Sequence, residues 1–312
     1  MAKDPIPDLI AQVDQERMSK NLFYLSKDPI PYRKVNYTLP GHAKNTLYEA
    51  DDFIVWKLGM PGYQVRREGC QVQAFRRDTS KPIRSQFAAP EPDDPRYTAY
   101  NIYVKKRGET HPEDVIIFIS HKDSQSWIDS PGAYDNAVGT VANMEIARIL
   151  RDVPLSRSIC FIFCNEEHRP WTSVTAANRA RERGDNIIAV FNLDSLGGKS
   201  QEDQNAGRKT NVTLYTEPEG ERLADLMAEV NEKYKIGLIQ QKLQRKSPGD
   251  DDGSFVKAGY KAAIANLGSY PYAEPNYHDV GDVPELVDLE NLRMSTQASL
   301  AAGVIVCSLG HY

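Results

Sequence analysis

Histidine and carboxylate side chains stand at or near the ends of short apolar runs at several widely separated points of this sequence. They are His121, Asp123, Asp135, Glu166, Glu167, Asp194 and His278. A single acidic residue after a strand usually caps a helix or lies in a solvated loop. Several carboxylates that meet at one place repel one another, however, and need a cation to neutralise them. The pattern therefore predicts metal chemistry at the rim of a sheet.

The donor types narrow the choice of metal. Imidazole and carboxylate groups without thiolate suit zinc and, less specifically, cobalt or manganese. Two ions about 3.5–4 Å apart need one bridging carboxylate and terminal ligands on each side. Two histidines and three carboxylates meet this requirement and leave Glu166 over. Because Glu166 stands beside the candidate ligand Glu167, we expect it to be the general base that takes a proton from the attacking water.

Short apolar runs that alternate with helical segments would position these groups. The runs cover residues 100–104, 115–119, 159–164, 187–193, 212–215 and 262–267. The run Val115-Ile-Ile-Phe-Ile119 is continuously apolar, which is typical of a strand buried on both faces. Apolar residues at steps of three and four after Asp135 predict an amphipathic helix, and residues 288–308 predict another.

These elements predict an α/β fold, a three-layer α/β/α sandwich with a mixed, largely parallel central sheet. In such sheets ligands bind beyond the carboxyl ends of the strands, where the candidate residues stand. Nearer the N-terminus, residues 1–24 and 45–60 are predicted as helices and residues 76–97 as a surface loop. We expect residues 1–40 to form an N-terminal helical extension and residues 41–312 to form one α/β domain.

Five motifs in a fixed order carry a family resemblance. They are His121-Lys-Asp123-Ser124, Pro131-Gly-Ala-Tyr-Asp135-Asn136-Ala-Val-Gly139, Asn165-Glu166-Glu167, Asn192-Leu-Asp194 and Tyr277-His278. Together they resemble the co-catalytic two-zinc aminopeptidase family that includes bacterial leucyl aminopeptidase and aminopeptidase Y. The resemblance covers about residues 98–290 and implies a zinc-exopeptidase fold, two bound zinc ions and a peptide substrate with a free N-terminus.

The resemblance also implies a role for each matched residue. The metal ligands would be His121, Asp135, Glu167, Asp194 and His278. Of these, Asp135 would bridge the two ions, while Asp123 would orient His121. Glu166 would be the general base, and Tyr277 would stabilise the tetrahedral oxyanion.

Three segments depart from the family pattern. Asn165 replaces the usual glycine before the Glu-Glu pair, and Trp171-Thr-Ser173 stands where a Leu-x-Gly-Ser turn is common. The later Ser-Asp-His-x-x-Phe segment is Asp250-Asp-Asp-Gly-Ser-Phe255, without histidine. We expect these changes to affect the wall of the substrate pocket rather than the metals, so the preferred substrate residue stays open.

Composition argues against two kinds of partner. The chain carries 38 basic and 43 acidic residues, a net charge of −5, and has no basic run, so we expect no nucleic-acid partner. The apolar stretch 301–309 is too short to span a bilayer, so we expect no membrane partner. The segment Met1-Ala-Lys-Asp-Pro5 lacks the apolar core of a signal peptide. If this terminus is native, we expect a cytoplasmic protein, and otherwise a secreted or periplasmic one whose signal has been removed.

Three alternatives remain open from the sequence. Glutaminyl cyclases share the architecture with one zinc, but their last ligand histidine typically follows Trp, whereas Tyr277 stands here. Carboxypeptidase or dipeptidase activity would use the same metal centre. A non-catalytic scaffold domain is the third alternative, although every candidate ligand and the base are present. The oligomeric state is left open.

Overall fold

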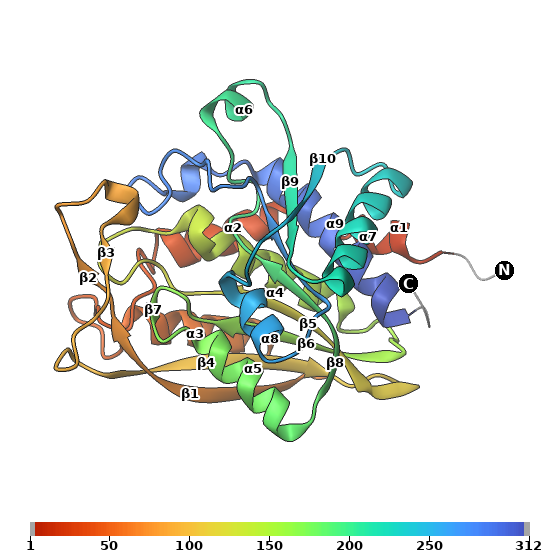
Figure 1. The fold of residues 1–312 in the computed structure, drawn as a ribbon, viewed down its shortest axis with the longest axis horizontal. Coiled ribbons are helices and arrows are strands. Elements are labelled where there is room, and N and C mark those ends of the chain that lie inside the picture. Colours follow the sequence, from red (N-terminus) through yellow and green to blue (C-terminus); the bar gives the residue numbers. More distant parts are fainter. Residues whose placement is uncertain (1–3, 309–312) are drawn as a thin grey trace.

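The computed structural model describes residues 4–308 and is built on a nine-stranded sheet with the order β10-β9-β11-β8-β5-β6-β4-β1-β7 (Figure 1). Residues 1–3 and 309–312 lie outside the described range, and with them the first residues of the predicted helix 1–24 and the last residue of the apolar stretch 301–309. The large strands are β1 (Gln64–Ala74), β4 (Tyr97–Lys106), β5 (His111–His121), β6 (Arg157–Cys164), β8 (Asn186–Leu193), β9 (Thr210–Tyr215), β10 (Ile239–Gln244) and β11 (Ala263–Leu267), and β7 (His168–Arg169) is short. The central strands β11, β8, β5 and β6 run parallel, while β4 and β1 continue the sheet antiparallel.

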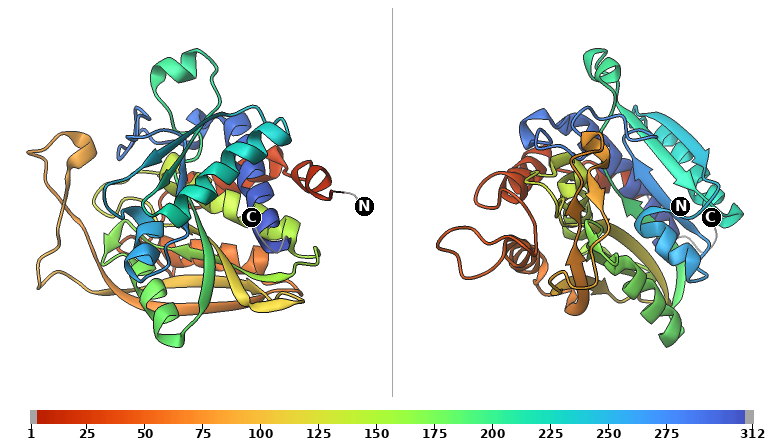
Figure 2. Two further views of the ribbon diagram at one scale, coloured as in Figure 1. Left: turned by 45° about the vertical axis from the view of Figure 1, so that its right-hand side comes forward. Right: turned by 60° about the vertical axis from the view of Figure 1, so that its left-hand side comes forward.

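Helices cover both faces of this sheet (Figure 2). Along β5, Ile116 and Phe118 face one side, and Ile117 and Ile119 face the other, because successive strand residues point to opposite faces. The first face packs against α2 (Gln15–Ser26), α3 (Thr46–Leu58), α4 (Val138–Leu150), α7 (Pro218–Lys233) and α9 (Leu289–Ser308). The second face packs against α5 (Thr172–Arg183) and α8 (Asp250–Lys257). The predicted three-layer α/β/α sandwich is confirmed.

The N-terminal segment differs from its prediction. Instead of one helix over residues 1–24, the described part has α1 (Ile6–Ile10) and α2, separated by a turn at which Asp14 accepts the backbone N–H of Arg17 as an N-cap. Both helices bury apolar residues in the same core as α4 and α9. A domain boundary at residue 40 stays a prediction.

Two strands escaped the sequence prediction because their composition is polar. The residues of β1 are mostly polar, and its buried positions alternate with exposed ones. The residues of β10 are largely exposed, and this strand lies at the edge of the sheet. The predicted loop 76–97 contains a small ribbon of β2 (Arg76–Arg77) and β3 (Phe87–Ala88), joined through the 3-10 turn η1 (Ile83–Ser85). This ribbon projects from the body of the molecule (Figures 1 and 2). Within residues 4–308, no helix has the length and apolarity needed to cross a membrane.

Candidate metal centre

Three parallel strands end at the same edge of the sheet and deliver four of the candidate residues. The last residue of β5, His121, lies in register with Cys164, the last residue of β6, and Asn165, Glu166 and Glu167 follow directly. The third strand, β8, ends at Leu193, so Asp194 is the first residue beyond it. Side chains that lie far apart in sequence therefore meet because parallel strands place their carboxyl ends together.

Asp135 lies in the turn η2 (Ala133–Ala137), which leads into α4 and in which Asp135 and Asn136 have non-helical φ and ψ angles. Its backbone N–H donates to Asp282 Oδ2 at 3.0 Å, and the N–H of Tyr134 donates to Asp282 Oδ1 at 2.8 Å. Asn136 anchors the same turn to β8, because its side-chain amide donates to the carbonyl of Leu193 at 2.9 Å. Asp282 therefore supports the turn that carries Asp135, and it belongs to neither group of possible ligands found within residues 4–308.

The last candidate ligand, His278, lies in the loop after β11 with a positive φ of 59°. Its Nδ1 hydrogen-bonds the carbonyl oxygen of Arg84, in η1, at 3.0 Å. This contact leaves Nε2 to face the site, and a carbonyl partner of this kind fixes the orientation of a metal-binding imidazole. The projecting ribbon thus helps to position the site.

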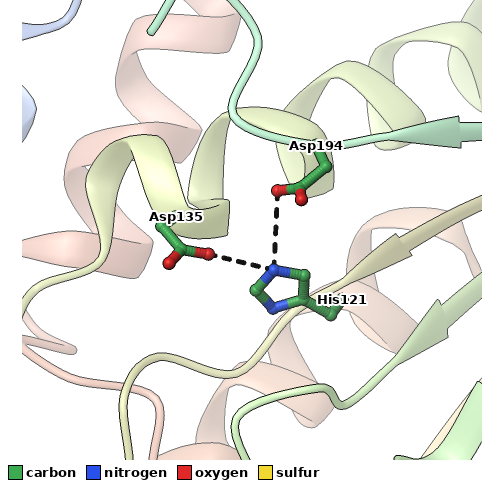
Figure 3. A group of neighbouring side chains, drawn as sticks. All are labelled: His121, Asp135 and Asp194. Atoms are coloured by element: carbon green, nitrogen blue, oxygen red, sulfur yellow. Dashed lines mark ion pairs between the residues drawn. The ribbon is translucent and has the colours of Figure 1, made fainter. Parts of the chain in front are cut away.

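The five predicted ligands form two groups that share Asp135. In the first group, His121 Nε2 lies 3.1 Å from Asp135 Oδ1 and 3.5 Å from Asp194 Oδ1 (Figure 3). In the second group, His278 Nε2 lies 3.1 Å from Asp135 Oδ2 and 3.7 Å from Glu167 Oε1. The two oxygens of one buried carboxylate therefore point to two different histidines, which is the arrangement expected of a bridging ligand.

The electrostatics of this cluster fit a divalent cation. Burial, and then the charge of Asp135, raise the pKa of Glu167 to about 7. Burial disfavours the charged form of His278, but hydrogen bonds to Asp135 and Glu167 outweigh it and raise the pKa of this imidazole to about 10. Protons are therefore held where buried carboxylates crowd together, and a cation bound by the same atoms would replace them. The imidazole and carboxylate donor set suits zinc.

Asp123 organises the segment that carries Glu166 and Glu167. Its carboxylate accepts the backbone N–H groups of Glu166 at 3.0 Å and Glu167 at 2.9 Å, and it lies 3.3 Å from His121 Nδ1. His168 adds a contact of 2.7 Å from its Nδ1 to the same carboxylate. Burial raises the pKa of Asp123, but the two histidines outweigh it and hold the pKa well below its usual range. Asp123 therefore contacts the predicted base and a second predicted ligand as well as His121.

Glu166 has a different environment from its neighbour. Its Oε2 is buried and has no hydrogen-bond partner within the described part of the chain. Burial, and then the nearby charges of Asp251 and Asp250, raise the pKa of its carboxyl group well above the usual range. A carboxylate with a free oxygen and a raised proton affinity beside the ligands has the properties of a general base.

Two stacked tyrosines contact predicted ligands of both groups. The ring of Tyr277 stacks on His278 with centroids 3.9 Å apart and on Tyr272 with centroids 4.5 Å apart. The hydroxyl of Tyr272 donates to Asp194 Oδ2 at 2.9 Å, so this residue orients a predicted ligand. The sequence motifs indicate Tyr277 but not this contact, because no motif spacing links residues 194 and 272.

The acidic segment that departs from the family pattern lies beside Glu166. Asp250 pairs with Arg245 at 2.7 Å, and Asp252 pairs with the same guanidinium. Burial raises the pKa of Asp252 to about 7, although Arg245 acts in the opposite direction. None of these aspartates belongs to either ligand group found within residues 4–308.

The chain matches the peptidase family M28 over residues 101–303, and it belongs to this family. Among curated proteins, it is 27% identical over 97% of its length to a probable aminopeptidase of Saccharomyces cerevisiae, YDR415C, of which it covers 75%. It is 26% identical over 62% of its length to a probable zinc metalloprotease of Pyrenophora teres f. teres, of which it covers 48%. The family resemblance inferred from the five motifs is confirmed.

Solved structures share the fold. An aminopeptidase from an Aneurinibacillus species superposes with a TM-score of 0.74 at 15% identity, covering 98% of this chain and 97% of the other. A glutaminyl cyclase from Bacteroides thetaiotaomicron superposes with a TM-score of 0.70 at 18% identity, covering 93% and 97%. Because both reactions occur on this fold, the choice between them depends on the site.

Proposed function

We propose that the protein is a two-zinc aminopeptidase that hydrolyses the N-terminal bond of peptides with a free amino group. The observation that carries this proposal is the pair of buried ligand groups that share Asp135, with Glu166 beside them. A bridging carboxylate between two His-carboxylate groups calls for two ions, whereas a one-zinc cyclase needs only one group. The aminopeptidase and zinc metalloprotease names of its relatives support the same assignment.

The chain's own residues have distinct tasks in this reaction. His121 and Asp194 would hold one ion, Glu167 and His278 the other, and Asp135 both. When bound, zinc would polarise the scissile carbonyl and would lower the pKa of water towards about 7.

Glu166 takes the proton of the attacking water on its carboxylate and returns it to the leaving amine. The Tyr277 ring lies against His278, so its hydroxyl is a candidate donor to the oxyanion. The substrate ammonium group would lie among the carboxylates of the site, which explains a requirement for a free N-terminus.

One assay separates this reaction from its rivals. Zinc-loaded protein is tested on aminoacyl arylamides, on the same compounds with the amine acetylated, and on peptides that begin with glutamine. We expect hydrolysis of the free amines only, and loss of this activity in Glu166→Gln as the control. Equal rates on acetylated compounds would contradict the aminopeptidase direction, and cyclisation of glutaminyl peptides without hydrolysis would favour the cyclase.

A further inference from the structure

Arg33, in the segment between α2 and α3, is completely buried near the metal centre. Its guanidinium group donates only to backbone carbonyls in the contacts described. Nε donates to Lys122 at 2.6 Å, Nη1 to Leu25 at 2.5 Å and Pro131 at 2.7 Å, and Nη2 to Gly132 at 2.7 Å. One side chain therefore ties together the end of α2, the residue after β5 and the turn before Asp135.

The carbonyls that Arg33 binds belong to the segments that carry ligands. Lys122 stands between His121 and Asp123, and Gly132 is three residues before Asp135. The backbone of Arg33 adds two bonds to Ser124, because its N–H donates to Ser124 Oγ and its carbonyl accepts the N–H of Ser124, both at 3.0 Å. Arg33 is thus fixed to the His121 segment and reaches across to the Asp135 turn.

The charge of Arg33 complements the carboxylates behind the ligands. Burial lowers the pKa of Arg33 to about 10, while Asp282, Asp123 and Asp135 act in the opposite direction, so the group is a cation at neutral pH. Asp282 accepts the backbone N–H of Asp135, and Asp123 accepts that of Glu167. A buried cation lowers the free energy of such buried carboxylates.

We propose that Arg33 is a positioning residue of the metal centre, which holds the His121 and Asp135 segments at the spacing that the two ions require. The inference rests on the proposed function, because it concerns the same centre. It also gives the N-terminal segment a task beyond covering the sheet. Residues that support ligands from behind typically change metal affinity by about 10–100-fold when they are replaced.

The test measures zinc affinity by competition with a chelating indicator in Arg33→Ala and Arg33→Lys. We expect about 10–100-fold weaker zinc binding in Arg33→Ala, and a smaller loss in Arg33→Lys, which keeps the charge but has fewer donors. Millimolar guanidinium should partly restore zinc affinity in Arg33→Ala, whereas urea, a neutral molecule of similar shape, should not. A merely structural role would not produce this difference.

Arg157→Lys is the matched control. Arg157 is a largely buried arginine at the opposite end of β6, where it donates to the carbonyl of Val306 at 2.6 Å and pairs with Asp114. Its replacement should lower stability without changing zinc affinity. Zinc affinity equal to wild type in a folded Arg33→Ala protein would overturn the proposal.

A measurement on the unmodified protein applies even if the variants do not fold. Zinc should slow hydrogen exchange of the Arg33 and Ser124 amides, because both are bonded within the segments that the ions fix. Unchanged exchange at both amides would also overturn the proposal. If the wild type binds no zinc, the proposed function fails instead.

Discussion

Glu166 and Glu167 are adjacent in sequence but contact different groups. Glu167 Oε1 lies 3.7 Å from His278 Nε2, whereas Glu166 Oε2 has no partner among the described residues. Replacement of Glu166 by Gln keeps the shape of the side chain and removes its basicity. We expect Glu166→Gln to lower kcat by about 10²–10⁴-fold with unchanged zinc content, measured by steady-state kinetics and elemental analysis.

Glu167→Gln serves as its partner experiment. An amide oxygen is a poorer zinc ligand than a carboxylate, so this variant should lose zinc affinity, and excess zinc should partly restore its activity. The two neighbours therefore give opposite patterns. If Glu166→Gln lost zinc while Glu167→Gln kept it, the two roles would be exchanged.

Tyr272 provides a second prediction at the residue scale. Tyr272→Phe removes the hydroxyl that donates to Asp194 and keeps the ring that stacks on Tyr277. We expect zinc affinity to fall by about 10-fold or more, because the ligand loses its orienting partner. Tyr270→Phe, at an exposed position nearby, is the control and should bind zinc as the wild type does. If the two variants bound zinc with equal affinity, the hydroxyl of Tyr272 would not contribute to zinc binding.

The predicted ligands lie together in the fold, whereas the contacts that support them were not predicted. His121 ends β5, and Glu167 and Asp194 come shortly after the ends of β6 and β8, so the strand pattern predicted that they lie at one edge of the sheet. The contacts of Tyr272 and Arg33 depend on loops whose paths follow no periodicity. Such partners become visible only when the chain is folded.

Helix α9 and strand β5 pack so closely that a change from Gly to Ala in α9 should destabilise the protein instead of stabilising it. Gly to Ala within a helix usually stabilises by about 1 kcal/mol. At Gly303 of α9, however, a Cβ would lie 2.5 Å from Phe118 Cζ of β5. We expect Gly303→Ala to lower the free energy of unfolding by about 1–3 kcal/mol in urea denaturation.

A second substitution checks the cause. Phe118→Leu removes the ring atoms that the new methyl group would meet, so it should be less damaging in the Gly303→Ala background than alone. Additive losses would show that the two positions do not clash.

Element prediction succeeded where burial and composition agree. The apolar runs 115–119 and 159–164 were predicted as strands, and they form the buried parts of β5 and β6. The strand β1 was missed because its polar residues carry little strand signal, and its pairing with β4 decides its conformation. The turn that separates α1 from α2 was missed because apolar residues continue across it.

At the scale of the whole molecule, zinc should contribute to stability. The ligands come from segments between residues 121 and 278, so they form a site only in the folded chain. A ligand that binds only the folded state stabilises it by about 4 kcal/mol when its free concentration is 1,000-fold above Kd. We expect a chelator to lower the Tm of the wild type in calorimetry, and Asp135→Asn to lose most of this response. Asp152→Asn, at an exposed position, is the control, and chelation should lower its Tm as much as that of the wild type.

The number of zinc ions per chain tests the two-metal centre most directly. Metal-free protein is titrated with zinc, excess ion is removed, and the bound metal is measured by elemental analysis beside the protein concentration. Because Asp135 is common to two ligand groups, we predict two equivalents in the wild type and less than one in Asp135→Asn. One equivalent or none in folded wild-type protein would contradict the two-zinc centre.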